Sequence, residues 1–186
     1  MKKISTKVVY EGKWIFVQEA QYENNDGRQY TWESVHRKRS SVGVVVIAKL
    51  MPSNLFILIK QYRPAIEGYI LSVPAGLGFD DPSQALIELK EETGYVGRIV
   101  ETSPILKTGA SLINDSARIV YIEVDESLPE NKDPRQELES AEDIHVCLVQ
   151  DHKAKEYILD EAKKGVHIAA NLWYLFGLPK YLTGTI

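Results

Sequence analysis

Three glutamates on one short predicted helix are the residues of this chain best suited to chemistry. Glu88, Glu91 and Glu92 stand at i, i+3 and i+4, so one helix face carries three charges that repel by roughly 0.2–0.5 kcal/mol per pair. Lys90 is two residues from Glu88 and points elsewhere. Clustered oxygen ligands of this kind hold Mg²⁺, usually together with waters and substrate phosphates. The spacing therefore predicts a metal site, with a solvated acidic face as the alternative.

Local signals mark both ends of this helix. Asp81 suits the N-cap position with Gln84 three residues later, and Pro82 suits the first helical position. Gly94 suits the left-handed residue that ends a helix. The sequence therefore predicts a helix that begins at Pro82 and stops at Gly94.

The rest of the chain predicts a mixed sheet with helices packed against it. Asn24-Asn25-Asp26-Gly27 between alternating segments is a hairpin signal. The run from Val42 to Ala48 is apolar throughout, which is typical of a strand covered on both faces. Strands are predicted at 7–10, 14–22, 28–37, 42–48, 55–62, 68–73, 97–102, 117–124 and 144–149, amphipathic segments at 151–164 and 166–176, and a polar, mobile loop at 125–142.

Composition narrows the class of protein. The chain has 186 residues, 44% of them apolar, which suits one domain or a domain with an amino-terminal extension. No apolar run approaches the roughly 18 residues of a membrane span, and the first residues lack the apolar core of a signal peptide, so we expect a cytoplasmic protein with no membrane partner. The net charge of -4 and the short basic run at 36–39 argue against binding to nucleic acid.

The segment from Ser72 to Leu77, followed by the glutamate helix, resembles the box of the Nudix hydrolase family. Gly76 matches the first glycine of that box and Gly94 its closing glycine, with the three helical glutamates between them. Ile87 stands where the family has an arginine. The loop after Gly76 is shorter than the family's and lacks its glutamate, with Phe79 near that place.

The resemblance extends over nearly the whole chain to the ADP-ribose pyrophosphatase branch of the family. It implies an α/β protein, a Nudix α/β/α sandwich with a mixed sheet, plus an antiparallel amino-terminal β-sheet extension. The extension is expected at 1–40, for dimerisation and adenine stacking, and the hydrolase domain at 41–186. The segments that carry this resemblance are 12–14, 30–35, 60–64, 67–69, 74–77, 103–104 and 141–144.

The glutamates predict how Mg²⁺, or Mn²⁺ in its place, is bound. Glu88 and Glu92, one turn apart, are the first pair of ligands, and Glu91 binds a second ion or a metal-bound water. The resemblance adds the carbonyl of Ala75 and the side chain of Glu142, which completes the metal site or lies close to the catalytic base. Glu137 and Glu139 in the same loop are rivals for that base.

Aromatic and basic residues are candidates for substrate binding. Trp14 and Trp32 offer flat faces on which a base can stack, with packing as the alternative role. Glu33 lies in the same segment as Trp32 and is predicted to bind substrate with it. Arg37 and Arg63 are candidates for the diphosphate, because guanidinium binds phosphate oxygens bidentately.

Together these features predict a homodimeric, metal-dependent hydrolase of ADP-ribose or a related nucleoside diphosphate sugar. Its products are a nucleoside monophosphate and a sugar phosphate. A second hypothesis is a catalytically weak or inactive Nudix fold that binds a nucleotide or a partner protein. It is motivated by Ile87, by the short loop, and by Ser72 and Thr108, which stand where the branch usually has acidic residues.

Overall fold

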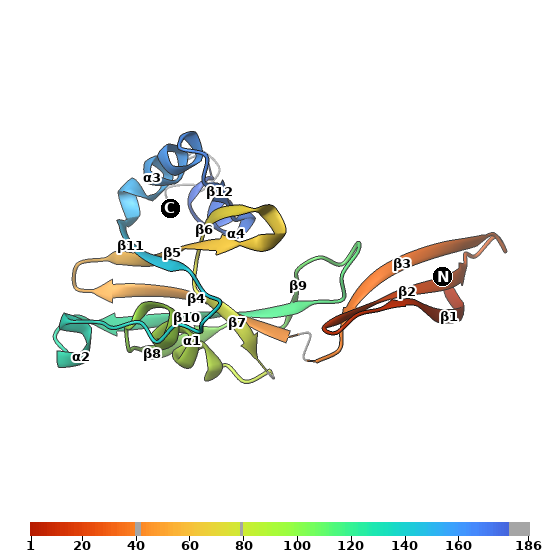
Figure 1. Ribbon diagram of the computed structural model, residues 1–186, viewed down its shortest axis with the longest axis horizontal. Helices are drawn as coiled ribbons and strands as arrows, with labels where there is room; N and C mark the ends of the chain where they lie inside the picture. Colours follow the sequence, from red (N-terminus) through yellow and green to blue (C-terminus); the bar gives the residue numbers. More distant parts are fainter. Residues whose placement is uncertain (40–41, 79, 179–186) are drawn as a thin grey trace.

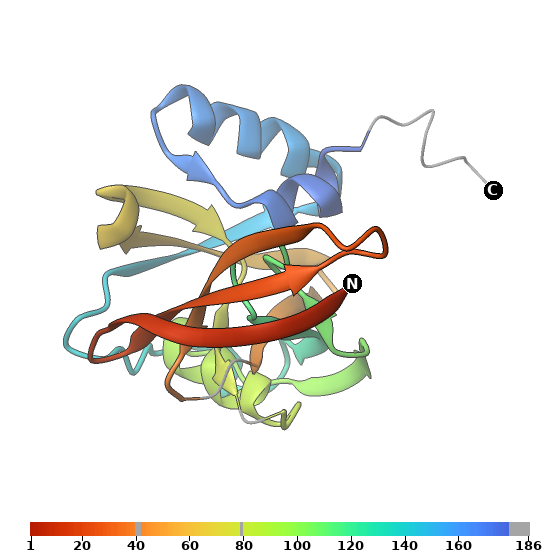
Figure 2. The same cartoon turned by 90° about the vertical axis from the view of Figure 1, so that its right-hand side faces the viewer.

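The computed structural model describes residues 1–39, 42–78 and 80–178, which form two separate sheets (Figure 1). The boundary expected at 40/41 and the predicted place of Phe79 lie outside the described residues. The smaller sheet extends away from the body of the molecule, and in Figure 2 its strands lie in front of that body. The predicted fold class, a mixed α/β body with an antiparallel amino-terminal sheet, is confirmed.

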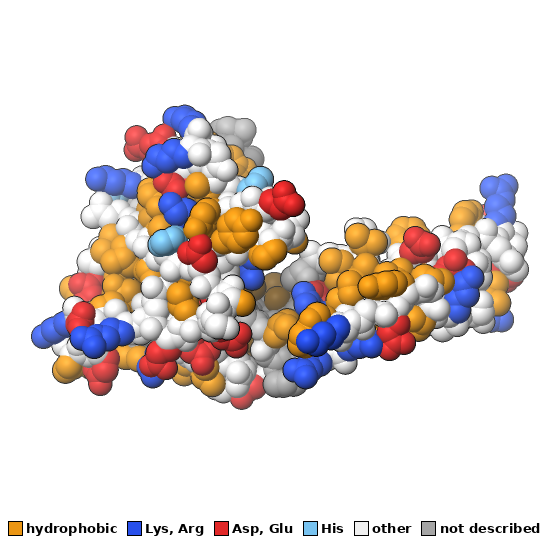
Figure 3. Space-filling view, in the orientation of Figure 1, with side chains coloured by type: hydrophobic (Ala, Val, Ile, Leu, Met, Phe, Trp, Pro, Cys, Tyr) orange, Lys and Arg blue, Asp and Glu red, His pale blue; other side chains and the backbone are white. Residues whose placement is uncertain are grey.

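The amino-terminal sheet consists of β1 (Lys2–Glu11), β2 (Ile15–Glu23) and β3 (Gln29–Arg37), all antiparallel. The hairpin between β2 and β3 is closed as its sequence predicts, because Asn24 Oδ1 accepts the backbone N–H groups of Asp26 and Arg28. Gly27 supplies the positive φ of 79° at this turn. Large apolar side chains are exposed along the sheet (Figure 3).

The main sheet is mixed. Its strands β4 and β10 pair in parallel, as do β6 and β12, and the other pairs are antiparallel. The strand order is β12-β6-β5-β4-β10-β8, with β11 beside β5, β7 beside β4 and β9 beside β10. The strands are β4 (Val42–Met51), β5 (Leu55–Arg63), β6 (Gly68–Ser72), β7 (Ala75–Gly78), β8 (Arg98–Thr102), β9 (Leu106–Lys107), β10 (Ser116–Asp125), β11 (Ile144–Gln150) and β12 (His167–Ile168).

Helices pack on both sides of this sheet and enclose two clusters of buried side chains. α1 (Gln84–Thr93) buries Ala85 and Leu89 against β4 and β10. α3 (Asp151–Lys163) and α4 (Ala170–Phe176) bury Ile158 and Leu172 against β5 and β6. A single 3₁₀ turn, η1 (Pro64–Ile66), joins β5 to β6. Within the described ranges, each helix is too short or too polar to cross a membrane.

The differences from the predicted elements have local causes. Strands β7, β9 and β12 and the short helix α2 (Pro129–Lys132) were not predicted, because two to four residues are too few to show a periodicity. α1 begins at Gln84 and not at Pro82, since residues 82 and 83 form a preceding turn in which Asp81 accepts the N–H of Ser83. It ends as predicted at Gly94, whose φ is 79°.

The segment 125–142, expected to be a mobile loop, is held by hydrogen bonds at several points. Asn131 pairs with both the N–H and the C=O of Val96. The Gln136 amide donates to the carbonyls of Glu92 and Ile144. These contacts fasten the acidic loop against the end of α1, so its polar composition reflects hydrogen bonding with the body and not exposure alone.

Candidate active site

A cavity of about 700 Å³ opens between the end of the amino-terminal sheet, the main sheet and α1. It collects side chains that are far apart in the sequence: arginines from β3 and β5, glutamates from α1, and acids from the loop before β11. The residues lining it are Arg37, Gly43, Val44, Val45, Gln61, Arg63, Ala75, Gly76, Leu77, Glu88, Glu92, Thr108, Asp115, Ser116, Glu139 and Glu142.

Strand β7 positions the two helical glutamates that reach the cavity. The N–H of Ala75 donates to Glu92 Oε2 at 3.0 Å, and the Glu92 side chain is almost fully buried, at 2% exposure. Glu88 lies against Gly76, where a Cβ atom would come within 1.8 Å of Glu88 Oε1. The glycine is therefore required by the carboxylate beside it, and the first glycine and first glutamate of the predicted motif are in contact.

Burial sets the electrostatics of this pair. It raises the pKa of Glu92 to about 8, an effect that the Ala75 N–H opposes and that the charges of Glu88 and Glu142 increase. Burial also raises the pKa of Glu88 to about 7, with further contributions from Glu91, Glu142 and Glu139. Two acids whose pKa values are raised in this way are unstable as a charged pair unless a cation joins them.

The oxygens present fit a hard divalent cation. Glu88 and Glu92 form no ion pair with a described cationic side chain, and Gly76 leaves the space that the Glu88 carboxylate occupies. Carboxylates of this kind, with water and phosphate oxygens, suit Mg²⁺. Within the described residues, no three Asp, Glu, His or Cys side chains already form a ligand cluster. Glu91, the third predicted helical ligand, is exposed and does not line the cavity.

The acidic loop brings two of its three candidate acids to the cavity. Glu139 and Glu142 both line it, and the Glu142 carboxylate accepts the backbone N–H of Glu139 at 2.9 Å. Glu137 pairs instead with Lys90 at 2.8 Å and does not line the cavity. The neighbour of Glu142, Asp143, is held by the hydroxyl of Tyr69. Glu139 and Glu142 are therefore the two acids placed to act as a base.

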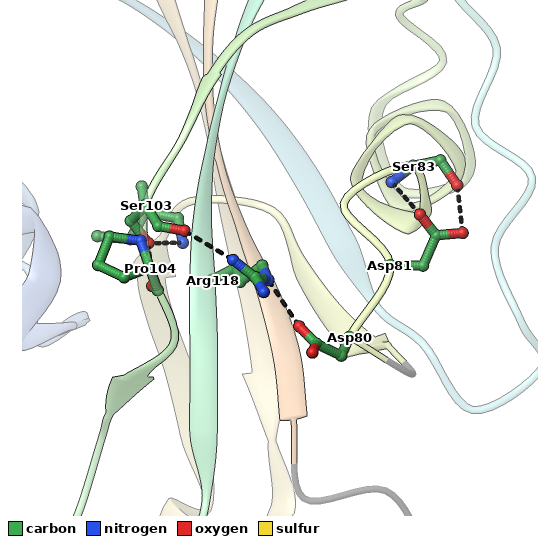
Figure 4. Close-up of polar contacts among 7 residues, drawn as sticks. Asp80, Asp81, Ser83, Ser103, Pro104 and Arg118 are labelled. Atoms are coloured by element: carbon green, nitrogen blue, oxygen red, sulfur yellow. Dashed lines mark hydrogen bonds and ion pairs between the residues drawn. The ribbon is translucent and has the colours of Figure 1, made fainter.

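The short loop between Gly76 and α1 is anchored through its two aspartates (Figure 4). Asp80, which has a positive φ of 63°, pairs with Arg118 of β10 at 2.6 Å, and Arg118 also donates to the carbonyl of Ser103. Asp81 accepts from both the N–H and the hydroxyl of Ser83. These contacts tie the loop to β10 and to the start of α1.

The two predicted arginines both line the cavity. The Arg37 Nε donates to Asp115 Oδ2 at 2.8 Å, and this is its one polar contact within the described residues. Its two terminal nitrogens therefore remain for a ligand. Arg63 lies at the end of β5, close enough to Glu92 to lower the pKa of that carboxyl. Cationic and anionic groups thus line the same cavity, as a metal-bound diphosphate requires.

The predicted stacking residues lie on the amino-terminal sheet and not on the cavity wall. The Trp32 indole donates to the carbonyl of Ser111 at 3.2 Å, whereas Lys13 and Arg39 lie over the ring of Trp14. Both rings are more than half exposed, at 52% and 59%. Glu33 is exposed and lies opposite Glu19 of β2.

Among the cavity residues that were not predicted as site residues, Gln61, Asp115 and Ser116 carry polar side chains. Gln61 lies on the same face of β5 as Arg63, two residues away, so strand alternation around that arginine was the signal that could have found it. Asp115 and Ser116 reach the cavity from the end of the segment before β10 and from the first residue of β10, and that segment hydrogen-bonds to β3 through Val35. Their sequence carries no signal of that long-range pairing.

Ile87, at the position where the resemblance predicts an arginine, is 46% exposed and is therefore not packed against the sheet. We expect Ile87→Arg to fold and to reduce the Mg²⁺ concentration needed for half-maximal turnover by about tenfold, because the new guanidinium would stand at i, i+4 from Glu91 and support the acidic face. Titration of Mg²⁺ in the turnover assay measures this shift. Ile87→Gln is the uncharged control, and equal Mg²⁺ dependence of all three proteins would point to the short loop instead.

Comparison with known proteins finds relatives that are named as nudix hydrolases or as hydrolases of ADP compounds. The chain is 36% identical over 171 residues to an ADP-ribose pyrophosphatase of Saccharomyces cerevisiae, covering 86% of this chain and 74% of that protein. It is 34% identical over 177 residues to a protein of Caenorhabditis elegans named as a nudix hydrolase, covering 89% and 79%. A crystal structure described as an ADP compounds hydrolase superimposes with a TM-score of 0.65 at 17% identity, over 86% of this chain and 83% of that one, and supports the fold. No family model matches the chain.

Proposed function

Because this chain belongs to the Nudix hydrolase family, in its ADP-ribose pyrophosphatase branch, we propose that it hydrolyses the diphosphate of ADP-ribose or a related nucleoside diphosphate sugar. The products are a nucleoside monophosphate and a sugar phosphate. The observation that carries this proposal is the single cavity in which Glu88 and Glu92 face the same space as Arg37 and Arg63. The relatives' names support the substrate class.

The cavity's own residues supply binding, positioning and proton transfer. Arg37 and Arg63 bind non-bridging oxygens of the diphosphate, and Glu88, Glu92 and the carbonyl of Ala75 would hold Mg²⁺ or Mn²⁺. The bound cation would polarise the phosphoryl oxygens and lower the pKa of an attacking water. A carboxylate oxygen of Glu142, or of Glu139 beside it, accepts the proton of that water.

We propose that two copies of the chain form a dimer through the amino-terminal extension at 1–40. Trp14 lies beside Lys38, whose N–H donates to the Trp14 carbonyl, and Trp32 lies six residues before Lys38, which separates the two tryptophans by about 20 Å along the strand direction. Two rings that sandwich one base stand only about 7 Å apart, at two ring contacts of about 3.5 Å each. One subunit's Trp32 would therefore need the partner subunit's Trp14 to enclose an adenine. The exposed apolar side chains of β1 support a covered surface.

Trp32→Ala should raise the KM for ADP-ribose by about ten- to a hundredfold, with kcat less affected, because base stacking is worth about 1–3 kcal/mol. Steady-state kinetics on the purified protein measure both constants. Tyr30→Ala is the matched control, since Tyr30 is exposed on the same face two residues away. An unchanged KM for Trp32→Ala would leave this indole with a packing role through Ser111.

The function itself is tested with a panel of nucleoside diphosphate sugars, incubated with Mg²⁺, with Mn²⁺, or with a chelator. We expect release of a nucleoside monophosphate from ADP-ribose with either metal and none with the chelator, read by phosphatase-coupled phosphate release. Ligand binding in Mg²⁺ without product over hours would favour a binding module in place of an enzyme. Release from other sugars with equal efficiency would widen the substrate class.

A further inference from the structure

Gln61 is a buried polar residue whose amide has no partner within the described residues. It is 4% exposed, lies on β5 and lines the cavity, yet its side chain forms no hydrogen bond there. Among described side chains, the one fully enclosed nitrogen or oxygen atom without a hydrogen bond is Oδ1 of Asp115. The Gln61 amide also lacks a hydrogen bond, so its atoms are not fully enclosed and remain accessible from the cavity. Buried amides are nearly always hydrogen-bonded, so one left open to a cavity points to a ligand or an ordered water.

The neighbours of Gln61 indicate which part of a ligand it meets. Arg63, two residues along on the same face of β5, lies at the exposed end of the strand, so Gln61 is deeper in the cavity. Glu92 is the other charged or amide side chain of the cavity that is this deeply buried, at 2% exposure. Gln61 pairs with Ile144 of β11, whose carbonyl shares the Gln136 amide with the carbonyl of Glu92, so Gln61 lies near the end of α1. We therefore expect it to meet the part of a substrate that lies near the helical carboxylates, and not its base.

We propose that the Gln61 amide N–H donates a hydrogen bond to a non-bridging oxygen of the diphosphate, beside the arginines. This assignment rests on the proposed function for its substrate class. An amide adds a donor without adding charge, which suits a phosphate oxygen that already faces a cation and acidic side chains. A diphosphate oxygen can only accept a hydrogen bond from the amide N–H, whereas the hydroxyl groups of a sugar can also donate to the amide oxygen. Loss of the N–H alone therefore distinguishes a diphosphate contact from a sugar contact.

The test measures binding, so it does not depend on turnover. Calorimetry with Mg²⁺ compares the methylene-bridged analogues of ADP-ribose and of ADP, which are not hydrolysed, with adenosine as a competitor lacking phosphate. Gln61→Met keeps the length of the side chain and removes the donor. We expect it to weaken both analogues by about ten- to a hundredfold, the effect of a hydrogen bond to a charged group, and to change adenosine binding less than about twofold.

Two further variants separate this assignment from other roles. Gln61→Glu keeps an acceptor but loses the donor, so it should weaken both analogues at least as much as methionine does. Tyr62→Met alters the adjacent residue on the opposite face of β5 and should leave binding unchanged. The melting midpoint of Gln61→Met should equal or exceed that of the parent, because an unpaired amide is removed.

The remaining outcomes overturn the assignment in distinct ways. Weakening of the ADP-ribose analogue alone would place the amide on the terminal sugar, and unchanged binding of all ligands would assign it to water. Full affinity in Gln61→Glu would make Gln61 an acceptor. A parent that binds both analogues but releases no AMP from ADP-ribose would defeat the proposed hydrolysis and leave this contact standing, whereas a parent that binds neither would defeat both.

Discussion

Replacing Glu92 by glutamine is expected to lower turnover of ADP-ribose by at least about a hundredfold, because it removes a metal-binding charge that stabilises the transition state. The amide oxygen of glutamine can still accept the Ala75 N–H, so the geometry of β7 and α1 should be kept. Glu88→Gln should act in the same direction. Glu137→Gln is the control, since that acid pairs with Lys90 away from the cavity.

The same substitution should stabilise the protein when no metal is present. The pKa of Glu92 is raised to about 8 in the folded state from an ordinary value of 4.5, so the folded state binds its proton more tightly than the unfolded state does. Stability of the metal-free parent therefore falls as the pH rises from about 4.5 to about 8, and Glu92→Gln escapes that loss.

Melting midpoints in a chelator at about pH 4 and about pH 9, on either side of that window, measure this effect. The variant should match the parent at the lower pH and exceed it at the higher one. Mg²⁺ should then raise the midpoint of the parent more than that of the variant, since only the parent keeps the full set of carboxylates. A variant less stable than the parent at the higher pH without metal would contradict the account of Glu92 as a destabilised charge.

Local sequence signals were enough to predict where α1 ends and which of its side chains share a face. The helix ends at Gly94 as predicted, since a left-handed residue is a property of a few neighbouring positions. Glu88 and Glu92 share a helix face because they are four residues apart, which is also a local property, and both line the cavity. The start of α1 was predicted too early because Asp81 caps a turn that precedes the helix.

Features that depend on long-range pairing could not be predicted from the sequence. Asp115 meets Arg37 because the segment before β10 pairs with β3, and contacts between residues 78 positions apart leave no local pattern. The exposure of Ile87 likewise depends on which side of α1 faces the sheet, a choice that an apolar residue on an acidic helix does not reveal. Gln61 was missed because its signal is indirect: strand alternation places it on the face of Arg63, but only once that arginine is known to face the cavity.

Gly76→Ala is expected to lower turnover by about ten- to a hundredfold while leaving the fold intact, because misplacing a catalytic group by about 1 Å has effects of that size. The added Cβ would stand 1.8 Å from Oε1 and 1.9 Å from Cδ of Glu88, so the carboxylate must leave its position. The end of a flexible side chain can move more readily than backbone, so the melting midpoint should change little. Gly109→Ala is the matched control, since its Cβ would meet Ile113 at an ordinary 3.6 Å.

A double-mutant cycle with Glu88→Ala tests whether the glycine acts only through this carboxylate. Once the Glu88 carboxylate is removed, Gly76→Ala has nothing to displace, so the double variant should turn over at the rate of Glu88→Ala alone. Additive losses would mean that the methyl group obstructs the substrate or the strand directly. The two effects are expected not to add, because the atoms closest to the new Cβ all belong to Glu88.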